Sequence, residues 1–534
     1  TIRSPAVAHV GEISIQVTQT IRRALALYAD RTAILDDPVT MTYRQFGDRV
    51  ARLAGALRKL GIGDDDKVAI LMLNNHRYLE LFYGTFWAGG VAVPLNIRLA
   101  PPELIYQLNE AEAKVLVVDD TFSLMLPAFE GKLHTVRHIV FAGPGSTPDR
   151  LLGYEQLLAE TAPADDAGRD GDDVAGIFYT GGTTGRAKGV MLTHDNIMAN
   201  AQNTLMTGQS GPHDVYLHCA PMFHLADCSG TFALTAVGAQ HAFIPYFEPG
   251  SVLAAVEKYR VSLLLAIPTM INMLLNHPDF KKHDLSSVRK VSYGAAPIPL
   301  ALLRRAIAEL KCDFIQGYGM TELSPICAML PPEDHKLEGT PEELKRLRSA
   351  GIPTFTADVR VVDDNDNPLP PGEVGEICAR GPMVMKGYWK QPEATAQALR
   401  GGWMHTGDAG YIDTDGYIYL VDRTKDMIVT GGENVYSVEV EAALHEHPAV
   451  FEAAVIGVPD DEWGEAVHAV VFLKPGKTAD EEELKHHCHG LIANYKCPKS
   501  VSFTTNELPK SPVGKILKRE LRKPFWEGHE RNIN

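Results

Sequence analysis

Short apolar runs alternate with segments of helical periodicity through most of this 534-residue chain. Strands buried on both faces of a parallel sheet read as continuous apolar runs, and helices cover such sheets. A helix-period segment at 300–310 is typical of the intervening stretches. The chain therefore predicts an α/β fold with layered, mainly parallel sheets. The clearest strand-type runs are residues 68–73, 114–118, 174–179, 262–266 and 290–293.

The pattern changes near residue 355. Strand-type runs at 359–362, 375–380 and 417–421 are separated by turn signals such as 413–416. This spacing is typical of a small β-barrel or a twisted antiparallel sheet. Helix and strand patterns then resume after residues 422–426. We therefore predict an N-terminal domain over residues 1–424, with a β-rich subdomain at about 355–421, and a small α+β C-terminal domain over 425–534.

Length and charge exclude several classes of protein. A chain of 534 residues is too long for one core and predicts three or four structural units. The net charge is −16 and no block of Lys and Arg stands apart from the acids, so nucleic acid is not expected as a partner. Apolar runs are far shorter than the roughly 20 residues needed to span a bilayer, so no transmembrane segment is expected. Peripheral membrane contact stays open.

The N-terminus and the cysteines favour a cytoplasmic enzyme. An amphipathic pattern at Val17, Ile21, Ala24 and Tyr28 predicts a helix where a secretory segment would be apolar throughout. Seven cysteines, an odd and scattered set, do not suggest a disulfide framework. The His- and Cys-rich run 485–489 invites a metal site, but adjacent residues on a helix point in different directions. A solvated helical surface is the preferred interpretation there.

A loop rich in glycine and threonine, Tyr-Thr-Gly-Gly-Thr-Thr-Gly-Arg-Ala-Lys-Gly-Val at 179–190, follows the predicted strand 174–179. Glycines let backbone N–H groups approach an anion, threonines add hydroxyl donors, and Arg186 and Lys188 add positive charge. Ligands of open α/β sheets bind beyond the carboxyl ends of the strands, so the loop predicts a polyphosphate site. It is not a Walker loop, because Ala187 precedes Lys188 and Gly189 follows it. A flexible surface connection is the alternative when the loop is taken alone.

Further short motifs follow in order along the chain, and together they resemble those of the acyl-adenylate-forming enzymes. This family includes acyl-CoA synthetases, adenylation domains of peptide synthetases and beetle luciferases. The family loop usually has serine at the position of Gly181 and proline at that of Ala187, so this loop is expected to be looser, and restoring either residue should change the apparent affinity for ATP more than that for the acid. The matching motifs are residues 221–224, 293–297, 316–322, 375–381 with 387–389, 403–408, 422–426 and 509–515.

The resemblance implies a two-step reaction. A carboxylate attacks the α-phosphorus of ATP to give acyl-AMP and pyrophosphate, and the thiol of coenzyme A then displaces AMP. Positioning and charge neutralisation are the protein's main contributions to the first step. The residues implied for ATP or AMP binding are Thr180, Gly181, Gly182, Thr183, Thr184, Gly185, Lys188, Gly294, Ala295, Ala296, Pro297, Gln316, Gly317, Tyr318, Gly319, Met320, Thr321, Asp408, Arg423 and Lys515.

The family motifs also imply individual roles. Lys515 would reach the carboxylate and the α-phosphate, where a mobile ammonium suits two oxyanions. Glu322 would be a hard oxygen ligand for Mg²⁺, with Thr321 beside it at the α-phosphate. Asp408 would accept from the ribose hydroxyls and Tyr318 would stack on adenine. Arg423 would assist at the ribose or phosphate, or form an interdomain salt bridge. His224 completes the implied catalytic set, although a lone histidine is often structural.

The remaining implied residues serve domain rotation and the acid. Lys425 occupies the hinge about which the C-terminal domain turns between the half-reactions, and Gly431 and Gly432 line the pantetheine tunnel. A Cys228–His224 nucleophile is a weak alternative, because the reaction needs no acyl-enzyme. The predicted acyl pocket consists of His224, Ala226, Asp227, Tyr293, Gly317 and Met320.

The acid is the least determined part of the prediction. Met320 would adapt to an alkyl chain or a ring, and Tyr293 would either shorten the pocket or bond a phenol. A medium- or long-chain fatty acid is the first preference and a hydroxycinnamate of the feruloyl type is the alternative. A freestanding adenylating enzyme for a carrier protein also remains, although only 19 residues follow Lys515. Light production is not demanded by any motif, and a nucleotide-binding pseudoenzyme is disfavoured by the retained catalytic set. A homodimer is one possible assembly.

Overall fold

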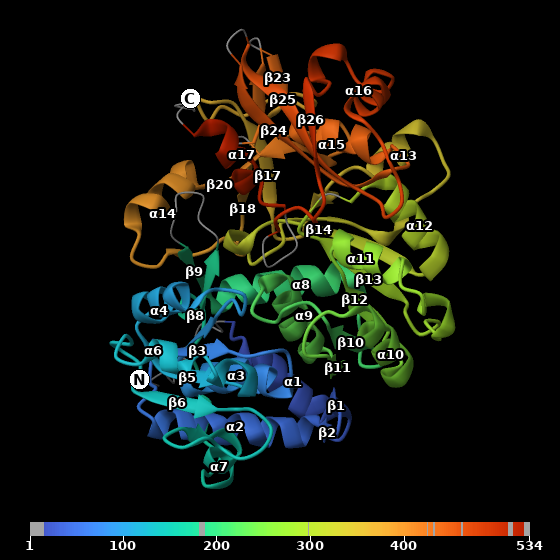
Figure 1. Cartoon of the computed structure of the whole chain (residues 1–534). Coiled ribbons are helices and arrows are strands. Elements are labelled where there is room, and N and C mark those ends of the chain that lie inside the picture. The colour runs from blue at the N-terminus through green and yellow to red at the C-terminus, as the bar shows by residue number, and fades with distance from the viewer. Residues whose placement is uncertain are drawn as a thin grey trace, which may run out of the picture.

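The computed structural model describes residues 15–180, 187–296, 298–423, 426–430, 433–460, 463–510 and 516–527. Within these residues the strands form four sheets, of eight, nine, four and five strands. Two large sheets and their helices make the lower part of the view in Figure 1, and the C-terminal sheet lies above them. The α/β alternation that the sequence predicts is confirmed.

The eight-stranded sheet carries the phosphate-loop hairpin near one edge. Its core is parallel, with β3 pairing β4 and β5, and it becomes antiparallel at β8 and β9. The apolar runs at 68–73, 114–118 and 174–179 fall on β3, β5 and β8. In spatial order the strands are β19 (Gly387–Tyr388), β9 (Lys188–Thr193), β8 (Val174–Thr180), β4 (Val91–Pro94), β3 (Lys67–Leu71), β5 (Ala113–Val118), β6 (His138–Phe141) and β7 (Leu152–Gly153).

The nine-stranded sheet is parallel through its centre. Side chains alternate between its faces, so that Leu217, Leu264 and Val291 form a row on one face while Tyr216, Leu263 and Lys290 form a row on the other. In spatial order the strands are β16 (Ile352–Pro353), β15 (Ala328–Leu330), β14 (Asp313–Tyr318), β13 (Lys290–Gly294), β12 (Leu263–Leu265), β10 (Val215–His218), β11 (Gln240–Phe243), β1 (Thr32–Asp36) and β2 (Val39–Thr42).

Helices fill the space between the two large sheets and cover their outer faces. The layer between them contains α1 (Thr18–Tyr28), α2 (Tyr43–Lys59), α3 (His76–Ala88), α8 (His194–Gly208) and α9 (Leu225–Ala236). The rings of Phe82, Tyr83 and Phe86 on α3 surround Phe232 of α9 at centroid distances of 5.9, 5.7 and 5.8 Å. These ring contacts fix the position of α9 against α3. Helix α9 forms part of the site described below.

The outer face of the nine-stranded sheet packs on α10 (Pro249–Tyr259), α11 (Pro268–Leu275) and α12 (Leu300–Leu310). Helix α12 has the bounds that the helix-period segment predicts. The outer face of the eight-stranded sheet packs on α4 (Pro101–Glu110), α5 (Asp120–Ser123) and α6 (Leu126–Phe129).

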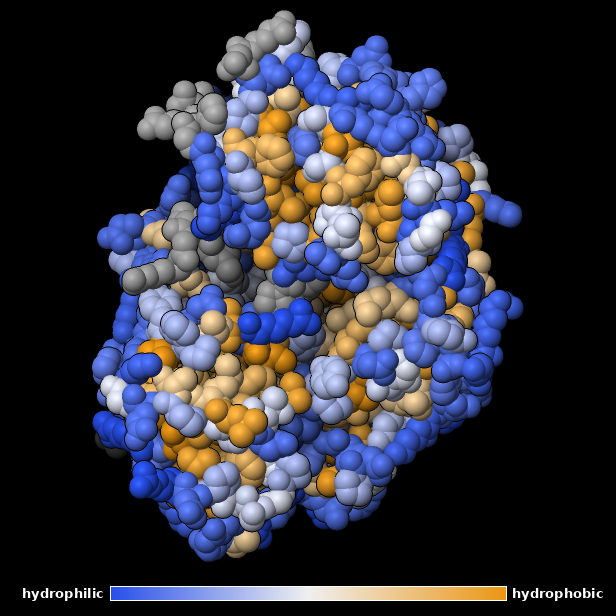
Figure 2. All heavy atoms as spheres, in the orientation of Figure 1, coloured by the Kyte–Doolittle hydropathy of each residue, from blue (hydrophilic) through white to orange (hydrophobic). Residues whose placement is uncertain are grey.

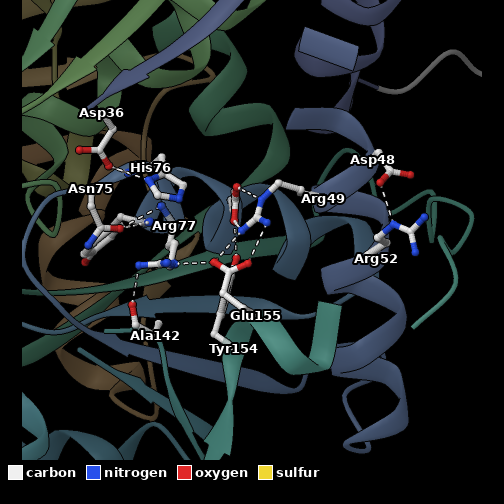
Figure 3. A network of polar contacts seen from close by, with 12 residues as sticks. Asp36, Asp48, Arg49, Arg52, Asn75, His76, Arg77, Ala142, Tyr154 and Glu155 are labelled. Carbon is white, nitrogen blue, oxygen red and sulfur yellow. Dashed lines mark hydrogen bonds and ion pairs between the residues drawn. The ribbon is translucent and has the colours of Figure 1, made fainter. Parts of the chain in front are cut away.

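An ion-pair network ties α2 and α3 to the short helix α7 (Tyr154–Ala159), as Figure 3 shows. Arg49 lies 2.6 Å from the fully buried carboxylate of Glu80 and 2.9 Å from that of Glu155. Arg77 bonds Glu155 from the other side at 2.8 Å, and the Tyr154 hydroxyl donates to Glu80 at 2.7 Å. Both carboxylate oxygens of Glu80 therefore have a donor, and Arg49 compensates the negative charge that is buried there.

The β-rich segment and the C-terminal part form separate sheets. The four-stranded antiparallel sheet contains β17 (Asp358–Val362), β18 (Gly375–Arg380), β20 (Met404–Ile412) and β21 (Ile418–Arg423), and α14 (Pro392–Ala398) lies between β19 and β20 in sequence. The C-terminal sheet contains β22 (Ile428–Thr430), β23 (Glu433–Val435), β24 (Val450–Asp460), β25 (Gly464–Leu473) and β26 (Ser500–Thr504), with α15 (Ser437–His445), α16 (Glu481–His489) and α17 (Lys518–Trp526). The helix α13 (Pro341–Arg346) precedes β16.

The surface view shows hydrophobic residues exposed on this face of both the upper and the lower parts, among hydrophilic ones (Figure 2). None of the described helices is long and apolar enough to cross a membrane. All seven cysteines are free thiols, as the sequence predicts.

Candidate active site

The phosphate-loop hairpin is joined to a buried carboxylate through one tyrosine. Strands β8 and β9 place Thr180 opposite Lys188 at the base of the loop. The Lys188 Nζ lies 4.7 Å from the centroid of the Tyr388 ring, within cation–π range. The Tyr388 hydroxyl donates to Glu322 Oε1 at 2.9 Å. One ring therefore connects the loop lysine with the predicted metal ligand.

Glu322, the predicted magnesium ligand, is a buried carboxylate. It is 5% exposed and lies on the short turn Thr321–Leu323 that directly follows β14. Carboxylate oxygens are hard ligands of the kind that Mg²⁺ prefers. Mg²⁺ usually takes one or two protein carboxylates and fills its other positions with substrate phosphates and water, so a single buried carboxylate at the carboxyl end of a parallel sheet fits this ion. Burial and the neighbouring Glu322 together raise the pKa of Tyr388, so Tyr388 remains a hydroxyl donor to this carboxylate.

A second corner of the site is formed by Asp408 and Tyr318. The Tyr318 hydroxyl donates to Asp408 Oδ2 at 3.0 Å, and the Asp408 amide donates to Thr406 Oγ1 at 3.1 Å. The preceding amide of Gly407 donates to Glu376 Oε1 at 2.9 Å. Two motifs 90 residues apart in sequence therefore meet, with the carboxylate expected for ribose beside the ring expected for adenine.

The adenine-motif strands approach each other without side chains between them. A Cβ on Gly294 would lie 2.3 Å from the carbonyl oxygen of Gly317, so this pairing of β13 with β14 requires glycine. Ala295 follows with φ 64°, in the left-handed region that non-glycine residues rarely adopt. Gln316 Oε1 accepts from the Tyr293 hydroxyl at 3.2 Å.

A cavity runs from this corner along the inner face of the nine-stranded sheet. It encloses about 1060 Å³ of space, its open mouth included. Its floor is the face carrying every second residue of three parallel strands, and α8 and α9 form its roof. The residues of this face are Leu263 and Leu265 on β12, Lys290, Ser292 and Gly294 on β13, and Ile315 and Gly317 on β14; Leu264 and Tyr293, at intervening positions, also line the cavity.

The roof leaves room at its centre because α9 presents the small residues Ala226 and Gly230 there. Ala226, Gly230 and Leu234 lie at i, i+4 and i+8 and share one face of the helix. His224 also lines the cavity, at the N-cap of α9, where its Nδ1 accepts from the Ala226 amide at 3.2 Å. Burial lowers the pKa of His224 to about 4, so its ring is neutral at pH 7.

Five of the six predicted acyl-pocket residues line this cavity: His224, Ala226, Tyr293, Gly317 and Met320. Asp227 does not. It is fully buried and turned to the other side of α9, where it accepts from Tyr216 and bonds His218. The prediction placed Asp227 in the pocket because it follows Ala226 in sequence. Adjacent residues on a helix differ in direction by about 100°, so the two side chains face different sides. Burial raises the pKa of the neighbouring Cys228 thiol, which excludes the thiolate that a Cys–His nucleophile needs.

The His- and Cys-rich run does not gather its side chains. On α16, Cys488 is buried, His487 Nε2 bonds the Ala443 carbonyl and His489 bonds Asn494. Among the described residues, the one trio with metal-ligand geometry is instead Glu376, Cys378 and His405. There the carboxylate is already engaged by the Gly407 amide, by His405 and by Arg400.

Several predicted residues fall outside the described part of the chain. For Arg423 only the backbone is described, and it pairs with Asp408 across β20 and β21. The roles of the others stay predictions. They are Gly181, Gly182, Thr183, Thr184, Gly185, Pro297, Lys425, Gly431, Gly432 and Lys515.

The sequence reasoning missed Lys290, Tyr216 and Tyr388. A signal for the first was present, because Lys290 and Ser292 occupy alternate positions of an otherwise apolar strand and so share one face. No signal placed Tyr388 beside Glu322, because their contact joins segments 66 residues apart.

This fold and this constellation are those of an adenylate-forming enzyme, and comparison with known proteins agrees. The AMP-binding enzyme family profile matches residues 21–389, and the AMP-binding enzyme C-terminal domain profile matches residues 439–515. The chain belongs to the AMP-binding enzyme family. Within it, the chain is an acyl-CoA synthetase, an AMP-forming acid–thiol ligase that uses ATP and coenzyme A.

The relatives act on aromatic and on aliphatic acids. A feruloyl-CoA synthase of Amycolatopsis sp is 42% identical over 509 residues, covering 95% of this chain and 98% of the relative. The long-chain-fatty-acid–CoA ligase FadD13 of Mycobacterium tuberculosis is 36% identical over 493 residues, covering 91% and 93%.

Solved structures resemble the whole chain. The anthranilate CoA ligase AuaEII in complex with anthranoyl-AMP has a TM-score of 0.88 at 29% identity, covering 96% of this chain and 97% of that one. ATP-bound MatB from Rhodopseudomonas palustris has a TM-score of 0.87 at 31% identity, covering 97% and 100%.

Proposed function

We propose that this acyl-CoA synthetase activates a phenolic aryl-propenoic acid of the hydroxycinnamate type. The observation that carries the proposal is Lys290, a buried amine at the far end of the acid cavity. Gly294 lies four positions further along β13, so the cavity floor between the two residues spans about 13 Å. An acid whose carboxylate lies at the nucleotide end would direct its other end toward Lys290.

Lys290 is placed to meet a polar group of the substrate. It is 5% exposed, and its Nζ makes no hydrogen bond or ion pair with the described part of the chain. Burial lowers its pKa to about 8, so the amine is still mainly protonated at pH 7. A buried ammonium needs an acceptor, and a phenol oxygen supplies one, whereas the methyl end of an alkyl chain would leave it without any.

The walls between the two ends suit a flat apolar body. Leu263, Leu265 and Ile315 form the floor, and Ala226 and Gly230 keep the roof thin. The feruloyl-CoA synthase relative supports an aromatic acid. A medium- or long-chain fatty acid is the second candidate, favoured by the same apolar floor and by the FadD13 relative.

The residues of the site divide the chemistry between them. In the first step the acid's carboxylate oxygen bonds to the α-phosphorus and the bond to the pyrophosphate oxygen breaks. In the second, the coenzyme A sulfur bonds to the acyl carbon, AMP leaves, and the thiol proton is released. Asp408 would hold the ribose beside Tyr318, and Thr321 would donate to the α-phosphate. His224 would border the reacting carboxylate. Because its ring is neutral, it would not form an ion pair with that carboxylate.

Two further charges would complete the site. Glu322 would hold Mg²⁺, which when bound neutralises phosphate charge. Lys515 would bring the second positive charge from the C-terminal domain, with the rotation absorbed at Lys425.

Seven free thiols support a reducing, cytoplasmic location.

The acid is tested by comparing wild type with Lys290→Met, which keeps the side-chain length and removes the charge. AMP release dependent on coenzyme A is measured for 4-hydroxycinnamic acid, for cinnamic acid and for decanoic acid. We expect wild type to prefer the phenol, and the variant to lose about ten-fold in kcat/KM for 4-hydroxycinnamate with little loss for cinnamate. A wild type that prefers decanoate, or a variant with an unchanged ratio of phenol to cinnamate, would refute the proposal.

A further inference from the structure

The core behind the acid cavity contains five polar side chains, four of which are hydrogen-bonded to one another. On α9, Asp227, Thr231 and Thr235 lie at i, i+4 and i+8 and so share one face of the helix. This face is turned toward His218 of β10 and His241 of β11. All five side chains are fully buried. Because buried polar groups destabilise a core unless they are satisfied, this arrangement calls for a specific role.

The hydrogen bonds form one chain that ends at Asp227. Thr235 Oγ1 donates to the Thr231 carbonyl at 2.8 Å and lies 3.1 Å from His241 Nε2. Burial holds the pKa of His241 well below its usual value, so this ring is neutral, and its Nδ1 shares a hydrogen bond with His218 Nε2 at 3.0 Å. His218 Nδ1 then donates to Asp227 Oδ2 at 2.6 Å.

At the Asp227 end, this chain of hydrogen bonds continues to a tyrosine that lines the cavity. Asp227 Oδ1 accepts from the Tyr216 hydroxyl at 3.0 Å. The Tyr216 ring packs against Gly230 of α9, where an added Cβ would lie 3.2 Å from Tyr216 Cζ. In the sheet, Tyr216 pairs with Leu263, which pairs with Lys290. Tyr216 therefore stands in the same row as Lys290, at the far end of the cavity.

We propose that Tyr216 is a specificity-determining residue that closes the far end of the acid pocket, and that Asp227 and His218 are positioning residues that hold its ring there. The inference deepens the proposed function, because it concerns the length of acid that the same pocket accepts. A tyrosine in an apolar wall can turn away when its hydroxyl finds water or another partner. The bond to Asp227, which is itself held by His218, fixes the hydroxyl and so fixes the ring across the pocket.

The experiment measures the longest acid that is activated. Straight-chain acids from hexanoic to hexadecanoic acid are compared by coenzyme A-dependent AMP release, for wild type, Tyr216→Ala and Asp227→Asn. We expect Tyr216→Ala to move the length limit to longer acids, with kcat/KM for the longest acid rising about ten-fold relative to hexanoic acid. Asp227→Asn should move the limit in the same direction by less, with the KM for ATP within about two-fold of wild type.

Thr231→Val is the matched control. It lies on the same buried face of α9, and its hydroxyl has no hydrogen-bond partner in the described part of the chain. A network that merely stabilises the packing of α9 would leave the length limit unchanged in every variant. An unchanged limit in Tyr216→Ala would therefore overturn the inference, as would an equal shift in Thr231→Val.

The two proposals fail separately. The preference of wild type for phenolic or aliphatic acids decides the proposed function, while the shift of the length limit between variants decides the role of Tyr216. If Asp227→Asn does not fold, as judged by circular dichroism, Tyr216→Phe takes its place, because it removes the bond to Asp227 and keeps the ring. A shift of the limit in that variant supports the positioning role, and an unchanged limit refutes it.

Discussion

The burial of Lys290 predicts that its replacement should stabilise the protein while impairing recognition of the acid. Its pKa in the folded chain is about 8 against an ordinary 10.5, and that difference corresponds to about 3 kcal/mol of disfavoured burial of charge at pH 7. The amine borders an open cavity, so solvent screening reduces the figure to about 2 kcal/mol. Lys290→Met should therefore raise the Tm by about 2–4 °C.

The pH dependence distinguishes this cause from ordinary repacking. Below pH 8 both folded and unfolded chains carry the proton, so the folded wild type bears the full cost of the charge. Between about pH 8 and 10.5 the unfolded chain binds more protons than the folded one, so wild-type stability rises with pH relative to the variant. The Tm advantage of Lys290→Met should therefore be constant up to about pH 8 and disappear by about pH 10.5.

The measurement is differential scanning calorimetry of both proteins, without substrates, at intervals from pH 6.5 to 10.5. Because a chain of several domains need not unfold in one step, the difference in Tm of the transition that contains the nine-stranded sheet is compared, rather than one free energy. A less stable variant, or an advantage that does not change with pH, would show that Lys290 is not a buried unsatisfied charge.

Two other predictions concern the nucleotide end. Lys515→Ala should nearly abolish pyrophosphate exchange yet still convert supplied acyl-AMP to the thioester, and equal loss of both steps would remove the division of labour assigned to this lysine. Tyr388→Phe keeps the ring beneath Lys188 but removes the hydroxyl from Glu322, so the KM for MgATP should rise about ten-fold and the Mg²⁺ requirement should increase, with the KM for the acid unchanged. The matched control is Tyr78→Phe, whose buried hydroxyl has no partner in the described residues, and a similar rise there would contradict the assignment.

Much of the fold and of the nucleotide corner follows from local sequence patterns. The run at 290–293 becomes β13 and the segment at 300–310 becomes α12, because period and apolar content already determine each element. The motif residues Tyr318 and Asp408 also meet, as two residues expected to bind one nucleotide should. Gly294 was implied only as a nucleotide-binding residue, whereas its close approach to Gly317, which leaves no space for a side chain, is a property of the folded sheet.

The acid pocket was less predictable because it depends on the direction of side chains after packing. Asp227 and Ala226 are neighbours in sequence, yet one faces the histidines of the core and the other faces the cavity. A one-residue difference on a helix turns a side chain by about 100°, so motif position alone cannot assign a lining residue. The register that aligns Tyr216, Leu263 and Lys290 is likewise a property of the assembled sheet.

The two ends of the nine-stranded sheet therefore serve different parts of the reaction. In the proposed function, the backbone and short motifs beyond the carboxyl ends of β13 and β14 would bind ATP, whose structure is the same for every acid. The side chains that line the cavity along the strand faces toward Lys290 would then each contact a different part of the acid. We therefore expect substitutions of side chains in that row to change the preferred acid more than the binding of the nucleotide, because the Lys290 side chain makes no hydrogen bond to that corner among the described residues. Such a separation would allow one family to include both a feruloyl-CoA synthase and a long-chain-fatty-acid–CoA ligase.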